Sequence, residues 1–305
     1  MNAATSATTQ AVAPEPAVAR GRDRRWRAML QATVAGWSDD RAASMGAALA
    51  FYTFFSMAPL LLIVVSVAGL VLGREAAQGH LMNELAGLVG ADAAATIEAL
   101  LASAREPADS VWATVVGVVT MLVGATTVFA ELQGALDRIW ESPDVPARGG
   151  LWAILRARVL SFGLILGLAF LLMVSLVFGA AVTALGRWWS GVFDLWAWLA
   201  QALNLLVGFG LTAVIFAMIY KLMPRVSVQW RDVWTGAFVT ALFFSVGKLL
   251  IGLYLGASGV ASAYGAAGSI VVVLLWVYYS AQVFLLGAEF TWVYARTRGS
   301  RRHLA

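Results

Sequence analysis

Ser262-Ala-Tyr-Gly-Ala-Ala-Gly-Ser-Ile-Val-Val-Val-Leu-Leu-Trp-Val-Tyr-Tyr-Ser-Ala-Gln-Val-Phe-Leu-Leu-Gly-Ala-Glu289 is the segment from which the architecture of the whole chain can be predicted. It carries no charged residue between Ala266 and Ala288. A helix of that length, rising about 1.5 Å per residue, is long enough to cross a hydrocarbon core of about 30 Å. The segment therefore predicts a membrane span over about 266–290.

The middle of this span contains polar residues that a purely anchoring helix would not need. Tyr278, Tyr279 and Ser280 are followed by Gln282, and Glu289 stands at the exit. Polar groups within lipid are costly, so they usually face the interior of a helix bundle or a pathway. The span is therefore the first place to look for a functional site.

The composition agrees with a membrane protein. Hydrophobic residues make up 61% of the 305 residues and charged residues 12%, whereas soluble domains have about 45–50% and about 25%. The chain has no cysteine, and its two histidines fall in a connecting segment and in the tail. Thiolate or histidine metal sites and cysteine nucleophiles are thereby excluded, and we expect no metal and no cofactor.

Apolar stretches of sufficient length predict an all-α, polytopic membrane protein with a bundle of six transmembrane helices. The expected spans cover about 46–72, 111–130, 159–185, 199–220, 233–255 and 266–290. Together they form a transmembrane domain over 46–295, followed by a basic tail at 296–305.

The segments outside the spans predict a helical periphery. Residues 1–22 read as a disordered tail. An amphipathic helix over 23–45 places Trp26, Leu30, Val34 and Trp37 on one face, a pattern typical of a helix in the membrane interface; the alternative is a flanking helix packed on the protein. Periodic leucines in 74–110 predict two short helices that form an extracytoplasmic cap.

The basic residues predict the orientation. Of the 21 lysine and arginine residues, Arg74, Arg105 and Arg187 fall on one side of the expected spans and Lys248 falls within a span. All others fall on the side of the two termini. The positive-inside rule then places both termini in the cytoplasm. Topology accounts for the basic charge, so we expect membrane lipids as partners and no nucleic acid.

Five residues are candidates for a pathway or its gate. Lys248 lies inside the fifth expected span, where a charge is costly, although its long side chain can also reach the outer interface. Gln282 and Tyr264 are polar residues of the last span and its entry. Glu289 either belongs to the pathway or is an interfacial carboxylate. Pro59 predicts a kink in the first span near Ser56, and this kink could act as a hinge.

Six glycines have the spacing typical of close helix packing. They are Gly163, Gly167, Gly252, Gly256, Gly265 and Gly268.

Several stretches resemble the YihY/BrkB family of bacterial inner-membrane proteins. They are Ala47-Ala-Leu-Ala-Phe-Tyr-Thr, Ser56-Met-Ala-Pro59, Leu136-Asp-Arg-Ile-Trp140, Tyr220-Lys-Leu-Met-Pro224, Trp230, Gly236, Gly247-Lys248, Tyr254, Tyr264-Gly265, Trp276, Tyr278 and Gly287-Ala-Glu289. The resemblance implies six helices, a role in the cell envelope linked to resistance to serum killing, and a suspected transport function. Some relatives carry the label "ribonuclease BN", which the absence of clustered metal ligands argues against here.

Two hypotheses of function follow. The first is a transporter or exporter of a small or lipid-like envelope solute across the bacterial cytoplasmic membrane. The alternative is a non-transporting envelope scaffold or integrity factor that self-associates through its glycine-rich helix faces. A membrane-embedded enzyme is disfavoured because the sequence shows no nucleophile and base pair and no metal site.

Overall fold

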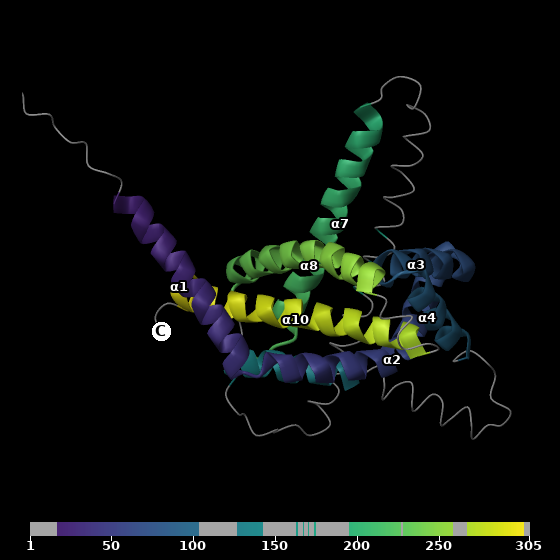
Figure 1. Ribbon diagram of the computed structural model, residues 1–305, viewed down its shortest axis with the longest axis horizontal. Coiled ribbons are helices and arrows are strands. Elements are labelled where there is room, and N and C mark those ends of the chain that lie inside the picture. Colours follow the sequence, from purple (N-terminus) through teal and green to yellow (C-terminus); the bar gives the residue numbers. More distant parts are fainter. Residues whose placement is uncertain are drawn as a thin grey trace, which may run out of the picture.

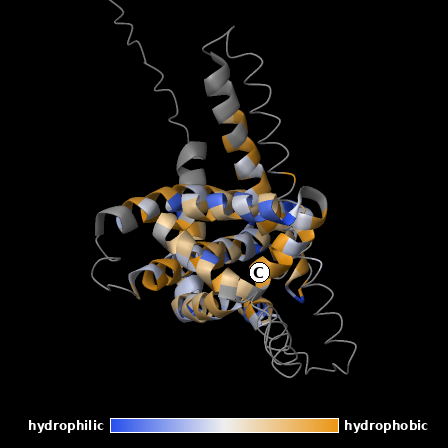
Figure 2. Cartoon of the chain, turned by 90° about the vertical axis from the view of Figure 1, so that its right-hand side faces the viewer, coloured by the Kyte–Doolittle hydropathy of each residue, from blue (hydrophilic) through white to orange (hydrophobic). Residues whose placement is uncertain are grey.

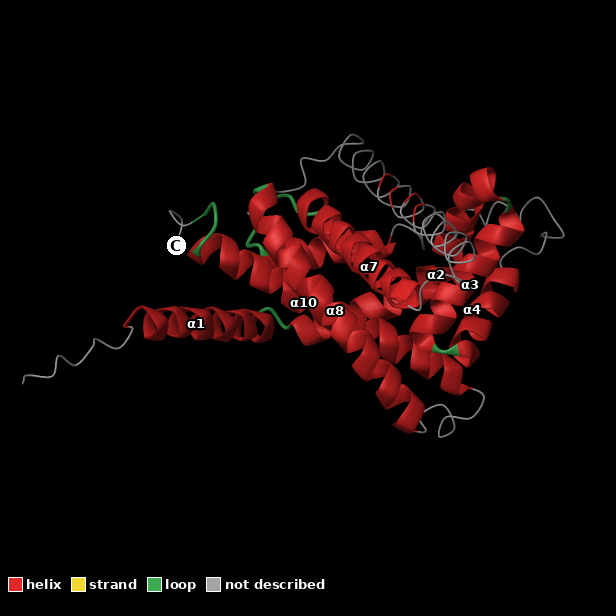
Figure 3. Cartoon of the chain, turned by 90° about the horizontal axis from the view of Figure 1, so that it is seen from above, coloured by secondary structure: helices red, strands yellow, loops and turns green. Residues whose placement is uncertain are grey.

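The described part of the chain is helical. A computed structural model describes residues 17–103, 127–142, 195–226, 228–258 and 267–301, together with the helical positions 163, 167, 170 and 174. None of these residues lies in a strand (Figure 3). The predicted all-α fold is confirmed for this part of the chain.

Helix α10 (Gly268–Thr297) is the central element of the fold. It lies between α8 (Trp230–Ser258) and α2 (Ala42–Leu72), which run beside it on opposite sides (Figure 1). Its apolar run buries Val273, Leu285 and Ala288 completely. The span predicted over about 266–290 therefore packs between two other helices. Such packing is what a span with polar residues in its middle requires.

Helix α7 (Leu195–Leu222) packs on α8 and projects from the rest of the described chain (Figure 1). Hydrophobic residues predominate along the projecting part (Figure 2), and Leu205 and Leu206 there are exposed. An apolar and exposed helix surface of this kind is suited to contact with lipid.

Three helices are long and apolar enough to cross a membrane, namely α7, α8 and α10. Helix α2 is a fourth candidate, with a bend of 48° between Ala42–Ala58 and Leu60–Leu70. The bend falls at Pro59 itself, a few residues after the expected position near Ser56. The spans expected at about 111–130 and 159–185 lie mostly outside the described residues, so six spans stay a prediction.

The N-terminal helix differs in its limits from the expectation. Helix α1 runs over Ala17–Asp39, so it begins inside the tail expected to be disordered and ends before position 45. It stops because Arg41 takes a left-handed conformation with φ 55° before α2 begins at Ala42. The chain therefore turns sharply at Asp40 and Arg41, and we call these two residues the α1–α2 junction.

Helix α1 is both packed and exposed. Met29 and Thr33 are 3% exposed and lie on the side of α1 that contacts α10. Trp26, Leu30 and Val34, on the face predicted for the membrane interface, are exposed instead. Helix α1 thus packs on the protein through one side, and its location in the membrane interface stays a prediction. It extends past the bundle beside the C-terminal end of α10 (Figure 3).

The two short helices predicted within 74–110 are present. They are α3 (Arg74–Val89) and α4 (Ala91–Ser103), and they begin after Gly73 and Gly90, whose φ angles are 83° and 89°. Both pack at the end of the bundle where α10 begins and α2 ends (Figure 1). Ile97 and Leu101 of α4 are buried in this contact.

Candidate functional site

The polar residues of α10 that face α1 and α2 form the candidate site. Gln282 and Glu289 are seven residues apart, which places them on the same face of the helix two turns apart. Both lie against the α1–α2 junction and the turns next to it. We call this contact the junction seam and define it by Gly36, Asp40, Gly46, Gln282 and Glu289.

Gln282 is held against the first turn of α2. Its amide nitrogen donates to the backbone carbonyls of Ala42 and Ala43, each at 3.4 Å. The side chain fills the space beside Gly46, where a Cβ atom would overlap its amide nitrogen. Its carbonyl oxygen Oε1 is buried and has no hydrogen-bond partner among the described residues. Gln282 therefore keeps a free acceptor inside the bundle.

Glu289 is buried at the other end of the seam. It is 2% exposed, and its Oε2 atom would lie 2.8 Å from a Cβ atom at Gly36 of α1. Asp40 follows Gly36 by one turn, with its backbone N–H donating to the Gly36 carbonyl at 2.9 Å, so the Asp40 carboxyl group lies close to that of Glu289. Oε1 of Glu289 is buried without a partner in the described part of the chain. The seam thus brings two carboxyl groups together, one of them fully enclosed.

Ion pairs surround these carboxyl groups without including Glu289. Asp40 Oδ1 is 3.5 Å from Arg138 Nε, and Glu141 Oε1 is 2.7 Å from Arg296 Nη1. Arg138 is therefore engaged by Asp40 of the seam and Arg296 by Glu141, and Arg41 of the junction is exposed.

The opposite side of α10 is fixed by hydrogen bonds to its backbone. The hydroxyl of Tyr220 on α7 donates to the carbonyl of Phe284 at 2.7 Å, and the indole of Trp140 donates to the carbonyl of Ala288 at 3.2 Å. Tyr220 and Trp140 are 0% and 1% exposed. These two aromatic donors hold the part of α10 that carries the seam residues.

Helix α8 contacts α10 through glycines. Gly236 receives Thr291, Gly247 receives the hydroxyl of Tyr279, and a Cβ atom at either glycine would overlap those side chains. At the end of α10, the backbone N–H and the hydroxyl of Ser300 donate to Asp232 Oδ2 at 2.9 and 2.6 Å. These contacts hold α10 from Tyr279 to the residues just after its C-terminal end.

The five candidate pathway residues do not all meet. Gln282 and Glu289 belong to the junction seam, and Pro59 marks the bend of α2. Lys248 is exposed on α8 and does not join the seam. Tyr264 lies outside the described residues.

Some of the glycines predicted to pack closely against another helix do so in the described part of the chain. Gly268 is buried, and a Cβ atom at Gly167 would lie 3.3 Å from Cε of Met218 on α7. At Gly163 and Gly252 a Cβ atom would meet nothing within 4 Å among the described residues, so close helix packing at these two glycines stays a prediction. Gly256 lies in the last turn of α8, which ends at Ser258, and Gly265 lies outside the described residues.

Sequence reasoning missed most partners of the seam. Asp40 and Gly36 belong to the amphipathic N-terminal region, which was interpreted as a peripheral helix. The available signal was a pair of acidic residues, Asp39 and Asp40, in an otherwise basic segment next to a span. Gly46 has no second glycine at the four-residue spacing typical of close helix packing, so no sequence signal pointed to it.

No group of three or more metal-ligating side chains occurs in the described ranges.

Comparison with known proteins identifies the family. The family described as "Virulence factor BrkB" matches residues 33–305. The chain belongs to the BrkB family. This confirms the resemblance drawn from the sequence, and several of the quoted residues now have a place. Trp140 and Tyr220 donate to the α10 backbone, Gly236 accommodates Thr291 of α10, and Gly287 of α10 lies against Thr240 and Tyr220.

The similar curated proteins are bacterial membrane proteins. A UPF0761 membrane protein of Pseudomonas paraeruginosa is 27% identical over 265 residues, covering 82% of this chain and 58% of that protein. One from Acinetobacter baylyi is 24% identical over 275 residues, covering 88% of this chain and 62% of the relative. The chain therefore spans about three-fifths of the length of these relatives. No solved structure matches the chain.

These names state a membrane location and no catalytic activity. The chain is accordingly a membrane protein of the BrkB family.

Proposed function

We propose that this BrkB-family protein transports or exports a small or lipid-like envelope solute across the bacterial cytoplasmic membrane. The observation that carries the proposal is the junction seam, where a half-buried Gln282 and a buried Glu289 lie within a candidate span. Each keeps one buried oxygen without a partner in the described chain. Placing polar groups within the membrane costs free energy, and buried polar atoms normally have hydrogen-bond partners. Buried oxygens without a partner in the described chain therefore favour a site that a ligand occupies transiently.

The neighbouring elements suit a site that opens. Helix α2, which carries Gly46 of the seam, is bent by 48° at Pro59. The α1–α2 junction turns through the left-handed residue Arg41. Bends and element ends are where membrane proteins absorb conformational change. We infer that α1 and the first half of α2 move relative to α10 when the solute passes.

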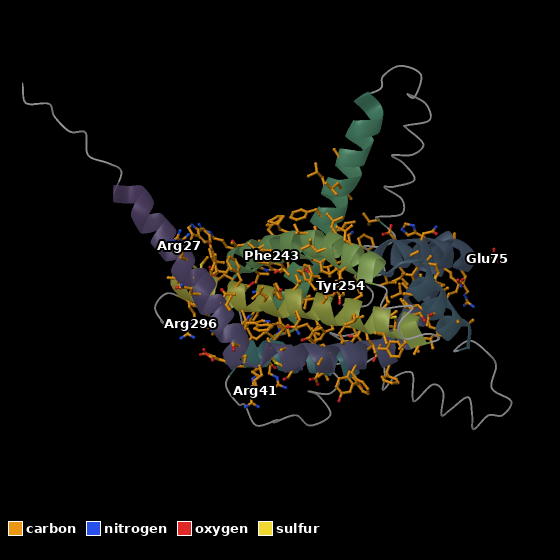
Figure 4. All side chains as sticks on the ribbon, in the orientation of Figure 1. Arg27, Arg41, Glu75, Phe243, Tyr254 and Arg296 are labelled. Carbon is orange, nitrogen blue, oxygen red and sulfur yellow. The ribbon has the colours of Figure 1, made fainter. Side chains whose placement is uncertain are left out.

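The orientation proposed from the basic residues also agrees with the fold. Arg27, Arg41 and Arg296 lie at one end of the structure and Glu75 lies at the other (Figure 4). Under the positive-inside rule the arginine end faces the cytoplasm, and α3 and α4 form the outer cap. The seam is then near the cytoplasmic side.

Flux in reconstituted liposomes tests the proposal. The assay measures transbilayer movement of a fluorescent phospholipid and release of a small anionic dye, so that both solute classes are covered. We expect flux with the parent protein and its loss in Gln282→Leu, which removes the buried amide. The matched control is Gln229→Leu, because Gln229 is exposed outside the candidate spans. Lys248→Ala tests in the same assay whether that exposed lysine takes part.

Equal flux in Gln282→Leu and in the parent protein would remove the seam from the pathway. Absence of flux with either probe, in a protein that is folded in the liposomes, would favour the second candidate.

That second candidate is a scaffold that self-associates through helix α8. A Cβ atom at Gly252 would meet nothing within 4 Å, and the neighbouring Leu249 and Leu253 are exposed. An open glycine in an apolar helix face allows another helix to approach closely. Loss of a native-size oligomer in Gly252→Leu, with unchanged flux, would support this role.

A further inference from the structure

The Glu289 carboxyl group lacks the partners that a buried carboxylate requires. It is 2% exposed, and no ion pair in the described chain includes it. Burying an ionised carboxylate without a paired cation is strongly unfavourable. A protonated carboxyl group avoids this penalty and gains an O–H donor.

The groups that face Glu289 come from three elements and are mainly acidic. Asp39 belongs to the end of α1, Asp40 to the junction, and Glu141 follows the helical residues 127–139. The cations Arg138 and Arg296 are paired with Asp40 and Glu141. Arg41 of the junction is exposed, and no ion pair among the described residues includes Glu289, so a bound proton can supply the positive charge that its carboxylate lacks.

We propose that the Glu289 and Asp40 carboxyl groups form a proton-binding site, and that the bound proton holds α1 against α10. In this state one carboxyl group donates its O–H to an oxygen of the other. The absence of a side chain at Gly36 lets the Glu289 carboxyl group lie directly against the α1 backbone. Two facing carboxyl groups that share one proton are a known way to avoid repulsion between like charges.

Release of the proton reverses the attraction. The pair changes from one carboxylic acid and one carboxylate to two carboxylates, and the proton passes to cytosolic water. The two carboxylates repel each other and Asp39 adds to the repulsion, so the end of α1 separates from α10. Docking of α1 is thus expected at low pH and is lost as pH rises.

This inference names a proton as the ion that drives the proposed transport, and only that coupling role rests on the proposed function. The binding site itself can be measured without any flux. A proton site in a protein without flux would disprove the transport proposal alone, and flux without a proton site would disprove this inference alone.

The first measurement is an infrared difference spectrum of the full chain in detergent between about pH 6 and alkaline pH, a range above the pKa of about 4 at which ordinary Asp and Glu side chains titrate. We expect the carbonyl band of a protonated carboxylic acid that titrates in the parent protein and is absent in Glu289→Gln. Glu75→Gln is the matched control because Glu75 is exposed at the other end of the molecule. In Asp40→Asn, whose amide can donate to an ionised Glu289, the band should be lost at neutral pH.

The second measurement is the distance between spin labels on Val34→Cys in α1 and Ile270→Cys in α10. We expect this distance to change with pH in the parent background and to stay constant in Glu289→Gln, whose amide replaces the protonated acid. A band that persists in Glu289→Gln, or the same pH response of the distance in that variant, would overturn the proposal. A distance that follows sodium concentration at fixed pH would overturn it as well, because a cation would then occupy the site.

Discussion

The hydroxyl of Thr291 on α10 occupies the space that a side chain at Gly236 on α8 would need. A Cβ atom there would lie 2.7 Å from Cβ of Thr291, and Thr291 cannot turn away without losing its own hydrogen bond to the carbonyl of Gly287 at 2.7 Å. The two helices therefore meet at a distance that only glycine permits at position 236.

Gly236→Ala should destabilise the protein because the added methyl group forces α8 away from α10. Overpacking of a tight contact costs about 1–3 kcal/mol. Gly252→Ala on the same helix is the matched control, since its methyl group meets nothing within 4 Å and alanine is the better helix former. Thermal unfolding in detergent should show a lower midpoint for the first variant and an unchanged or higher midpoint for the second. Equal midpoints would mean that the helices separate at no cost.

Tyr220→Phe should lose a buried hydrogen bond without leaving a cavity. The hydroxyl group of Tyr220 donates to Phe284 and lies 3.2 Å from Thr240 Oγ1, so its removal should cost about 0.5–1.5 kcal/mol. Tyr254→Phe on the exposed face of α8 should leave stability unchanged. Thermal unfolding of both variants in one detergent checks the difference, and a larger effect in Tyr254→Phe would contradict it.

The central helix could be predicted because its signal is local. An uncharged run of membrane-spanning length at 266–288 requires only hydropathy to be recognised, and α10 covers it from Gly268 onward. The ends of α1 could not be predicted in the same way. They depend on the left-handed turn at Arg41, for which arginine carries no sequence signal, and on contacts of Met29 with α10 that join residues far apart in the chain.

The candidate site was half predictable for the same reason. Gln282 and Glu289 stand out as polar residues in an apolar span, whereas Asp40 and Gly36 become site residues only when α1 folds back onto α10. Lys248 shows the opposite case. A charged residue in a span is a reasonable candidate because burying a charge in lipid is costly. The sequence could not show that Lys248 is exposed on α8, because apolar residues surround it on every side of the helix and do not define which face points outward.

The orientation can be tested directly because the chain contains no cysteine. Single replacements Ser38→Cys and Ala76→Cys place one thiol near the arginine end and one near Glu75, both at exposed positions. A membrane-impermeant maleimide should label Ala76→Cys in intact spheroplasts and Ser38→Cys only after permeabilisation. The parent protein gives the background. Labelling of Ser38→Cys from outside would reverse the proposed topology.

Pro59→Ala should straighten α2, because alanine restores the backbone N–H that proline lacks and removes the ring that clashes with the preceding turn. Spin labels at Ala47→Cys and Leu70→Cys, both exposed, report on the 48° bend between them. At about 1.5 Å per residue, a straight helix would separate these positions by about 3 Å more than the bent one. Labels at Phe238→Cys and Leu253→Cys on α8 should keep their distance in the same variant. If the α2 distance also stays constant, the bend is imposed by packing against α10 and α4 and not by the proline. In that case the straightened helix would not be available as a moving part, and flux in Pro59→Ala should equal that of the parent protein.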